Sequence, residues 1–154
     1  MNSAKNNKTN QNIQNNNQSK KLLDISSDLP VKSLYQILSK NPKLVNKVDD
    51  KGETLLTYSI KRKKIDVCQL ILSSSILDLS YQDKNGNSYL HLAVVKQLEV
   101  IVKALIEKGI YINMQNNDGN TPLHFAYLYD STPIIYILIN NHIDTTIKIG
   151  IKAM

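Results

Sequence analysis

Three groups of side chains in this sequence have chemistry that functional sites use. His91 and His124 could bind a metal ion or act as general bases, since a neutral imidazole nitrogen can do both. Cys68 could act as a nucleophile if its thiol lost a proton readily. The basic run Lys61–Lys64 could bind an acidic partner or serve as a nuclear-import signal. Which of these roles applies depends on the elements that position the residues.

No catalytic motif accompanies these residues. The sequence lacks the nucleophile elbow G-x-S-x-G, the phosphate-binding loop G-x-x-x-x-G-K-[ST] and the zinc motif H-E-x-x-H. Cys68 lies within an apolar segment, which favours a small core residue over a nucleophile. A single cysteine also excludes an internal disulfide and a zinc site built on cysteines. We therefore expect no enzyme activity, no cofactor and no metal site.

Three glycines mark the period that organises the chain. Gly52, Gly86 and Gly119 are 34 and 33 residues apart, and each begins a version of one phrase. The three versions are G-E-T-L-L-T-Y-S, G-N-S-Y-L-H-L-A and G-N-T-P-L-H-F-A. A fixed period in the low thirties is typical of stacked supersecondary units.

The phrase resembles the ankyrin repeat, whose signature is T-P-L-H-x-A between a glycine turn and a helix. The resemblance covers roughly residues 29–150, with Leu55 and Tyr89 in place of the motif proline. It implies an all-α solenoid of about three full repeats, with β-hairpin or turn fingers and partial repeats at both ends. It also implies that His91 and His124 hydrogen-bond the adjoining turn, and we favour this structural role. Thr57 replaces the histidine in the first full repeat.

The residue types of the phrase have physical reasons. Glycine permits a left-handed turn, and a Ser88 or Thr121 hydroxyl should cap a helix, which contributes about 1 kcal/mol. Leucines should fill the core, and small residues should let a neighbouring repeat pack closely. These positions are Leu56, Leu90, Leu123, Ser59, Ala93 and Ala126.

We divide the chain into five segments. Residues 1–21 form an Asn- and Lys-rich tail with almost no large apolar residues, which predicts disorder. Residues 22–51 form a partial N-terminal capping repeat. Full repeats are predicted at 52–85, 86–118 and 119–151, the last of which runs into a truncated C-terminal stub.

Apolar periodicity and helix-end signals predict the helices. In the capping repeat, Asp28 is the predicted N-cap, Pro30 lies in the first helical turn, and Asn41-Pro42 ends the helix. Gly109 and Pro133 mark one helix end and one helix start. The other predicted helices cover about 55–62, 65–72, 89–96, 98–108, a segment from Pro122, and 134–139.

The positive charge of the chain does not indicate a nucleic-acid binder. The formal net charge is +6, but the lysines of residues 1–21 contribute +4, which leaves +2 for the remainder. A nucleic-acid binder would concentrate positive charge on its folded face. A nuclear or nucleic-acid-associated role stays open as an alternative that rests on Lys61–Lys64. We favour a solvated loop between helices for this run.

Residue usage also predicts location and origin. A lone cysteine without a signal peptide predicts a reducing compartment, and no apolar run is long enough for a membrane span. One arginine, Arg62, against eighteen lysines indicates an AT-rich genome, such as that of an intracellular bacterium, a large DNA virus or an amoeba. We expect a cytoplasmic protein, in the host cytosol or nucleus if it is secreted.

The resemblance implies where a protein partner would bind. Ankyrin proteins usually contact partners through a concave surface of hairpin tips and exposed inner-helix positions. Carrying these positions over predicts fifteen contact residues: Asp50, Lys51, Glu53, Lys61, Arg62, Lys84, Asn85, Asn87, Val95, Lys96, Asn117, Asp118, Asn120, Leu128 and Tyr129. Leu128 and Tyr129 are the predicted hot spot, although Tyr129 could equally just cover the loop before Ser131.

The expected function is therefore a non-enzymatic protein-binding module, and the composition extends this expectation to a host-directed factor of an intracellular bacterium or large virus. The last repeat lacks a polar capping helix, which favours truncation and leaves an apolar end that could self-associate weakly. The abrupt end and weak first repeat keep a second interpretation open, a degenerate paralogue with no selected partner.

Overall fold

The computed structural model describes residues 29–141. The predicted tail of residues 1–21, Asp28 and the C-terminal stub lie outside the described residues. Within the described range, the chain forms seven α-helices and one 3₁₀ helix. Extended pairing in this range is confined to an isolated antiparallel bridge between Gln82 and Ser88. The predicted all-α class is confirmed, while the assigned segment boundaries stay predictions.

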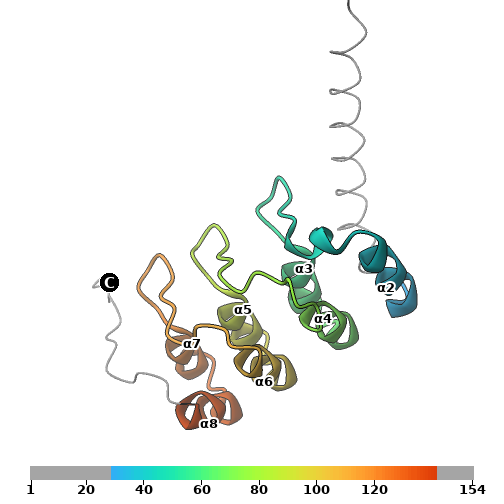
Figure 1. Ribbon diagram of the computed structural model, residues 1–154. Helices are drawn as coiled ribbons and strands as arrows, with labels where there is room; N and C mark the ends of the chain where they lie inside the picture. The colour runs from blue at the N-terminus through green and yellow to red at the C-terminus, as the bar shows by residue number, and fades with distance from the viewer. Residues whose placement is uncertain (1–28, 142–154) are drawn as a thin grey trace, which may run out of the picture.

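The helices form two rows, which Figure 1 shows nearly end-on. The inner row contains α3 (Leu55–Lys61), α5 (Tyr89–Val95) and α7 (Pro122–Leu128). The outer row contains α4 (Ile65–Leu72), α6 (Glu99–Glu107) and α8 (Thr132–Asn140). Each inner helix packs against the outer helix that follows it, and α5 packs against both α3 and α7. This arrangement is a solenoid of three helix pairs.

An incomplete unit precedes the three pairs. Helix α2 (Val31–Lys40) packs beside α4 at the start of the outer row, and the 3₁₀ helix η1 (Pro42–Asn46) packs against α3. The predicted helix of the leading repeat is therefore present, and it ends before Pro42 as expected. Its N-cap was predicted two residues too early, at Asp28: Pro30 is the N-cap, with an extended ψ of 139°, and precedes the first turn.

The core lies between the rows and between successive pairs. The motif leucines are buried, and so are the small residues Ser59, Ala93 and Ala126 of the closely packed inner helices. Cys68 is buried in α4 and belongs to this core. The residue types of the repeated phrase therefore have the packing roles predicted for them.

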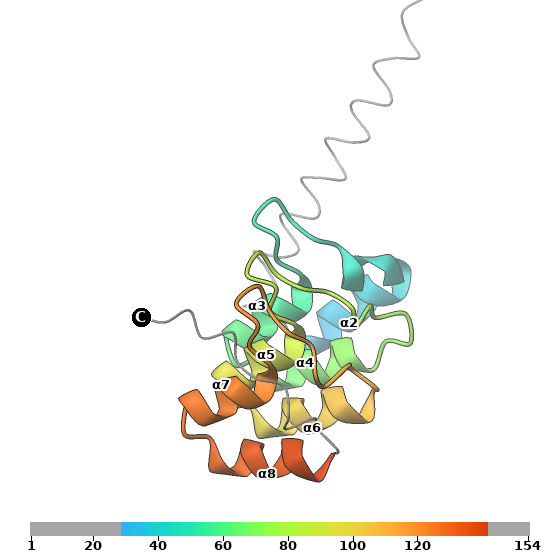
Figure 2. The ribbon, with the colours of Figure 1, turned by 90° about the vertical axis from the view of Figure 1, so that its left-hand side faces the viewer.

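Three hairpins, one before each inner helix, project to the same side of the helices, in chain order (Figures 1 and 2). We call residues 49–53, 83–87 and 116–120 the first, second and third hairpins. In each, the backbone N–H of the first residue donates to the carbonyl of the fifth at 2.9 Å. The same backbone hydrogen bond therefore closes all three hairpins.

Each inner helix is joined to its outer helix by a tight turn with a left-handed residue. These residues are Lys63, Gln97 and Asp130, with φ of 56°, 56° and 51°. The next residue donates its N–H back to the carbonyl of Ser59, Ala93 or Ala126 at 2.9–3.0 Å. Non-glycine residues adopt this conformation at a steric cost, so three equivalent turns carry the same strain.

Candidate partner-binding surface

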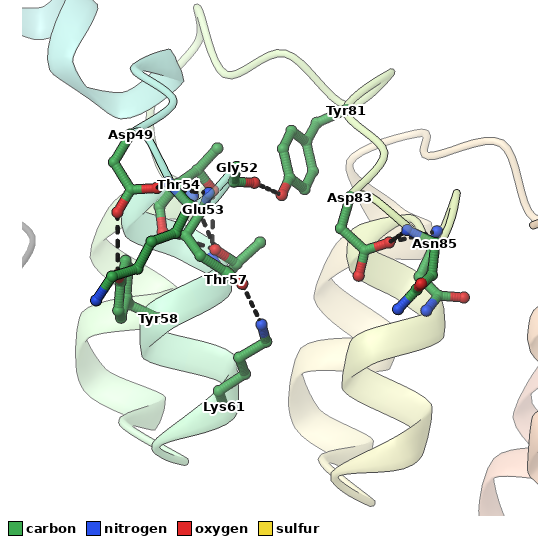
Figure 3. A network of polar contacts seen from close by, with 12 residues as sticks. Asp49, Gly52, Glu53, Thr54, Thr57, Tyr58, Lys61, Tyr81, Asp83 and Asn85 are labelled. Atoms are coloured by element: carbon green, nitrogen blue, oxygen red, sulfur yellow. Dashed lines mark hydrogen bonds and ion pairs between the residues drawn. The ribbon is translucent and has the colours of Figure 1, made fainter.

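Each hairpin is shaped by one side chain at its first position. Asp49 Oδ1 accepts hydrogen bonds from the backbone N–H groups of Lys51 (2.9 Å) and Glu53 (2.8 Å), while Oδ2 accepts from the Tyr58 hydroxyl (3.0 Å). Figure 3 shows this carboxylate turned inward, between the hairpin and α3. Both carboxylate oxygens of Asp49 therefore accept hydrogen bonds from groups of the first repeat.

The same arrangement recurs in the other two hairpins. Asp83 Oδ1 accepts from the backbone N–H groups of Asn85 and Asn87, both at 2.9 Å. Asn116 Oδ1 accepts from those of Asp118 (3.0 Å) and Asn120 (2.9 Å). Sequence reasoning missed these three turn-forming residues. The available signal was an Asp or Asn three residues before each periodic glycine.

The second and third hairpins are joined mainly by amide and backbone groups. The Asn117 N–H donates to the Asn85 carbonyl (2.9 Å), and Asn117 Nδ2 donates to the Lys84 carbonyl (3.0 Å). Asn116 Nδ2 donates to Asn87 Oδ1 (2.9 Å). We call this contact the amide junction. It fixes the two tips relative to each other.

His91 strengthens the amide junction from below. Its Nε2 lies 2.8 Å from the carbonyl oxygen of Asn120, which can only accept, so Nε2 carries the hydrogen. Its Nδ1 then accepts from the backbone N–H of Ser88, at 3.1 Å, which completes a capping box. Burial lowers the pKa of His91 below its ordinary value, although the Asn120 hydrogen bond opposes that shift. The predicted structural role of this histidine is confirmed.

The first and second hairpins are joined differently, by two stacked tyrosines. The Tyr81 and Tyr89 rings lie 4.8 Å apart with an interplanar angle of 19°. The Tyr81 hydroxyl donates to the Gly52 carbonyl (2.5 Å), as Figure 3 shows, and the Tyr89 hydroxyl lies 3.0 Å from Thr54 Oγ1. We call this contact the tyrosine junction. Burial raises the pKa of Tyr89 to about 12, so both rings stay neutral near pH 7.

The two departures from the motif proline are accommodated within the fold. Leu55 is buried in the core, and Tyr89 is buried with its hydroxyl hydrogen-bonded. Thr54 and Thr57 form a capping box in the first full repeat, so α3 begins without either the proline or the histidine. Tyr89 instead supplies the inter-repeat contact.

Cys68 does not have the environment of a nucleophile. It is fully buried, and burial together with the nearby Asp66 carboxylate raises the pKa of its thiol to about 12. A thiol in this state is protonated and inaccessible near pH 7. The interpretation of Cys68 as a core residue is confirmed.

The basic run spans the turn between α3 and α4. Lys61 ends α3 and forms an ion pair with Glu53, while the Arg62 guanidinium lies 5.0 Å from the Tyr58 ring centroid. Lys63 is the left-handed residue and Lys64 is the N-cap of α4. All four side chains are exposed, but the run is a folded turn rather than an extended loop.

The fifteen predicted contact residues fall on two adjacent lines of the solenoid. One line follows the hairpins and the other follows the C-terminal ends of the inner helices. Together we call them the recognition face. Several members also support the fold: Glu53 pairs with Lys61, Asn87 accepts from Asn116, and Asn117 donates to Lys84. Exposed members include Asp50, Lys51, Lys84, Asn85, Asp118, Leu128 and Tyr129.

The predicted hot spot lies at the end of α7. Leu128 is 71% exposed and Tyr129 is 43% exposed. The Tyr129 ring meets Phe125 edge-on, with centroids 6.3 Å apart, and Phe125 meets His91 in the same way at 5.4 Å. Tyr129 is therefore supported from below by an aromatic row that leads back to the amide junction.

The side of the last helix pair that faces away from α5 and α6 also exposes apolar groups. Ile60 and Val94 occupy equivalent positions of the inner helices and are fully buried by the next pair. Tyr127, at the same position of α7, is 56% exposed. In α8, Ile139 is 41% exposed. Residues after 141 are outside the described range.

Neither a metal site nor a membrane span is found in the described part of the chain. Between residues 29 and 141, no three His, Cys, Asp or Glu side chains come together as metal ligands. None of the helices in this range has the length and apolar character needed to cross a bilayer.

Comparison with known proteins supports the same fold. The sequence matches the family "Ankyrin repeats (3 copies)" over residues 14–116 and again over 77–149. It is 38% identical over 89 residues to an ankyrin repeat protein of fowlpox virus (strain NVSL), a match that covers 56% of this chain and 20% of the viral protein. Ankyrin repeats are protein–protein interaction modules and are generally non-enzymatic. By its period, its fold and its family match, this chain belongs to the ankyrin repeat family.

Proposed function

We propose that the chain binds a partner protein through the recognition face. The proposal rests on how each hairpin is held in shape. Asp49, Asp83 and Asn116 each accept hydrogen bonds from backbone N–H groups of their own hairpin. The tips and helix ends are therefore held in register without a ligand. A surface ordered in advance loses less conformational entropy on binding.

The host-directed role is a finer part of this proposal. It is supported by the similarity to a fowlpox virus protein, of which the matched stretch spans 20%. A second support is the composition of the chain. Its eighteen lysines against one arginine indicate an AT-rich genome, such as that of an intracellular bacterium or a large virus. On this proposal the protein acts in the cytosol of a host cell, or in the nucleus if it is imported there.

Site-specific crosslinking tests the proposed face. A photo-crosslinking residue replaces Asn85, at the second hairpin tip, and in a matched variant replaces Lys103 on the exposed surface of α6. Both proteins are irradiated in candidate host-cell lysate. We expect a discrete protein adduct at position 85 and none at 103. The Asn85 adduct should disappear when Arg62→Glu, Leu128→Ala and Tyr129→Ala are combined with it.

Two other outcomes would favour the alternative functions. Equal or absent adducts at both positions would contradict the proposed face and favour a paralogue without a partner. Adducts to nucleic acid that weaken steeply with added salt would favour the nucleic-acid alternative. The folded form of Lys61–Lys64, with Lys61 paired to Glu53, is an argument against an extended import signal.

Self-association through the C-terminal end stays a prediction. The exposure of Tyr127, against full burial of Ile60 and Val94, is the observation that bears on it. Sedimentation of the full chain over a hundredfold concentration range measures it directly. A single monomeric species throughout would contradict the prediction.

A further inference from the structure

The C-terminal ends of the three inner helices present a graded line of side chains. Two consecutive positions repeat in each unit, at the same 34- and 33-residue spacing as the glycines; they are exposed in the first and third repeats and half-buried in the second. We call them the helix-end strip, and they are Lys61, Arg62, Val95, Lys96, Leu128 and Tyr129. The strip begins with two cations, continues with one apolar residue and one cation, and ends with two apolar residues.

The cationic end of the strip is held in place by its own repeat. Lys61 contacts Glu53, and Arg62 lies over the Tyr58 ring, which also donates its hydroxyl to Asp49. A guanidinium stacked on a ring keeps its N–H edges free to donate. Arg62 is exposed, and its guanidinium can donate hydrogen bonds to a carboxylate of a partner.

The hairpin line carries both signs over the same repeats: Lys51 and Lys84 are exposed, and so is Asp50. The stem of Lys84 crosses the first hairpin, since a Cβ placed on Gly52 would lie 3.2 Å from Lys84 Cε. This brings the Lys84 side chain beside the tip that carries Lys51. Cations thus stand on both lines of the recognition face across the first and second repeats.

The third repeat of the recognition face has no lysine or arginine. Its hairpin tip carries Asp118, and the left-handed turn after Tyr129 carries Asp130; both are exposed. The exposed apolar pair Leu128 and Tyr129 directly precedes Asp130 in the chain. The helix-end strip is therefore cationic at one end, and apolar with an acidic border at the other.

We infer that the helix-end strip binds an extended segment of a partner protein with separated acidic and apolar parts. Its carboxylates lie over Arg62 and Lys96, and a large apolar or aromatic side chain lies on Leu128 and Tyr129. This inference rests on the proposed function of the recognition face and adds the partner's chemistry. Exposed ion pairs contribute little affinity each but orient the approach, whereas apolar contacts anchor it.

The fold also sets the spacing within that segment. Adjacent packed helices lie about 8–10 Å apart, so the ends of α3 and α7 are separated by about 16–20 Å. An extended chain advances about 3.3 Å per residue. The acidic group and the apolar anchor are therefore about five or six residues apart. A continuous polyanion does not fit, because Asp118 and Asp130 border the apolar end.

Peptide binding to the purified full chain tests this inference by fluorescence anisotropy. The probe has three acidic residues, a Gly-Ser spacer of four residues and a Leu-Phe end, and is made in both chain directions. One direction should bind at least tenfold more tightly than three control peptides. These lack the acids, lack the apolar pair, or lack the spacer.

Matched substitutions then assign each half of the probe. Arg62→Glu with Lys96→Glu should weaken the acidic probe at least tenfold and should favour a probe with lysines in place of its acids. Leu128→Ser with Tyr129→Ser should remove the advantage of the Leu-Phe end. Lys103→Glu on α6 and Tyr136→Ser on α8 change exposed residues outside the face and should have no effect. Circular dichroism confirms that each variant stays folded.

The results that overturn the inference differ from those that overturn the proposed function. Absence of binding up to millimolar peptide, or affinity independent of spacer and composition, contradicts the graded-strip inference. So does tighter binding of a DNA duplex that is lost in the same charge variants. If crosslinks still form at position 85, the recognition face stands and only the partner chemistry is wrong. Loss of those crosslinks refutes the proposed function as well.

Discussion

The tyrosine junction and the amide junction solve one structural problem with different chemistry. Each holds two neighbouring hairpins in the same register. The first uses the stacked rings of Tyr81 and Tyr89, with hydroxyls on Gly52 and Thr54. The second uses Asn117 and His91, which bond to backbone carbonyls of neighbouring hairpins.

The difference shows that the repeat constrains geometry more strongly than residue type. Thr57 stands where His91 stands one repeat later, and a threonine is too short to reach the next hairpin. Tyr89, at the motif-proline position, supplies the missing contact from the other side. The tyrosine junction depends on apolar burial, whereas the amide junction depends on satisfied polar groups.

The largest expected effect comes from removing the buried ring of the tyrosine junction. Tyr89→Ala deletes a fully buried aromatic side chain and should lower the free energy of unfolding by about 3–5 kcal/mol. Urea denaturation followed by circular dichroism measures the change. Tyr136→Ala, which removes an exposed tyrosine of α8, is the control and should change stability by no more than about 0.5 kcal/mol. Similar losses in both variants would mean that the stacked pair is not the junction.

The amide junction is broken most directly at Gly86. A Cβ at this position would lie 2.7 Å from the backbone nitrogen of Asn117, and φ is +76°. Gly86→Ala should therefore cost about 2–4 kcal/mol through left-handed strain and the steric clash together. Hydrogen exchange should become faster in α7 and α8 than in α3 and α4.

Gly109→Ala separates strain from the clash. Gly109 also has a positive φ, of +93°, but a Cβ there meets nothing within 4 Å. Gly109→Ala should therefore lower the free energy of unfolding by about 1–2 kcal/mol. Equal losses at Gly86 and Gly109 would show that contact with Asn117 does not matter.

Acid should weaken the amide junction and leave the tyrosine junction unchanged. The pKa of His91 is lowered by burial, so the unfolded chain binds its proton more tightly than the folded chain. The His91 contribution is complete above the ordinary pKa of 6.5 and is lost as pH falls through the folded-state value. Below pH 6.5 we expect the free energy of unfolding to decrease by up to about 1.4 kcal/mol per pH unit from this group.

His91→Gln is the variant that isolates this effect. Glutamine can still donate to the Asn120 carbonyl but does not titrate, so the difference between the two unfolding profiles reports His91 alone. Urea denaturation at half-unit steps from pH 8 to pH 5 provides both profiles. Parallel profiles over this range would rule out the predicted proton linkage.

The smallest effect concerns a feature that the three helix pairs share, the left-handed turn between inner and outer helices. Gln97→Gly should raise the free energy of unfolding by about 0.5–1 kcal/mol, because glycine adopts a φ of 56° without steric cost. Lys108→Gly places glycine at an ordinary helix end with φ of −73° and should instead destabilise. Thermal unfolding measures both. A destabilised Gln97→Gly would indicate that the glutamine side chain supports the turn.

Most of the helices could be predicted because their signals are local. Thr121-Pro122 and Asn41-Pro42 fix helix boundaries through cap and backbone chemistry that acts within one turn. Helix α4 has the same bounds in the structure as in the prediction. The start of α2 was misplaced because Pro30 suits both the N-cap and the first turn.

The contacts between repeats could not be predicted from local pattern. Tyr81 and Tyr89 stack because the second hairpin folds back on its own helix, and Asn117 reaches Lys84 across 33 residues. The left-handed turns were missed because Lys63, Gln97 and Asp130 are not glycines. The turn-forming Asp and Asn residues lay within reach of sequence reasoning, since their offset from glycine is constant.

The residues of the candidate surface were predicted from their positions in the repeat. In the structure, some of them also form hydrogen bonds that hold the fold together. Asn87 and Asn117 share hydrogen bonds within the amide junction, so replacing either would alter the fold as well as any contact. Leu128 lies outside such networks as an exposed apolar group. The contact role of all fifteen residues stays a prediction.

The inward-facing acceptor of each hairpin has an evolutionary consequence. In the first hairpin, Asp49 bonds to backbone N–H groups, and those groups are present whatever side chains follow. Residues 50 and 51 can therefore mutate without altering the loop conformation that displays them. Selection can change the residues at the outward tip, whereas substitutions of Asp49 alter the loop conformation and are selected against. A family built on such loops can acquire new specificities by single substitutions, without first evolving a new fold.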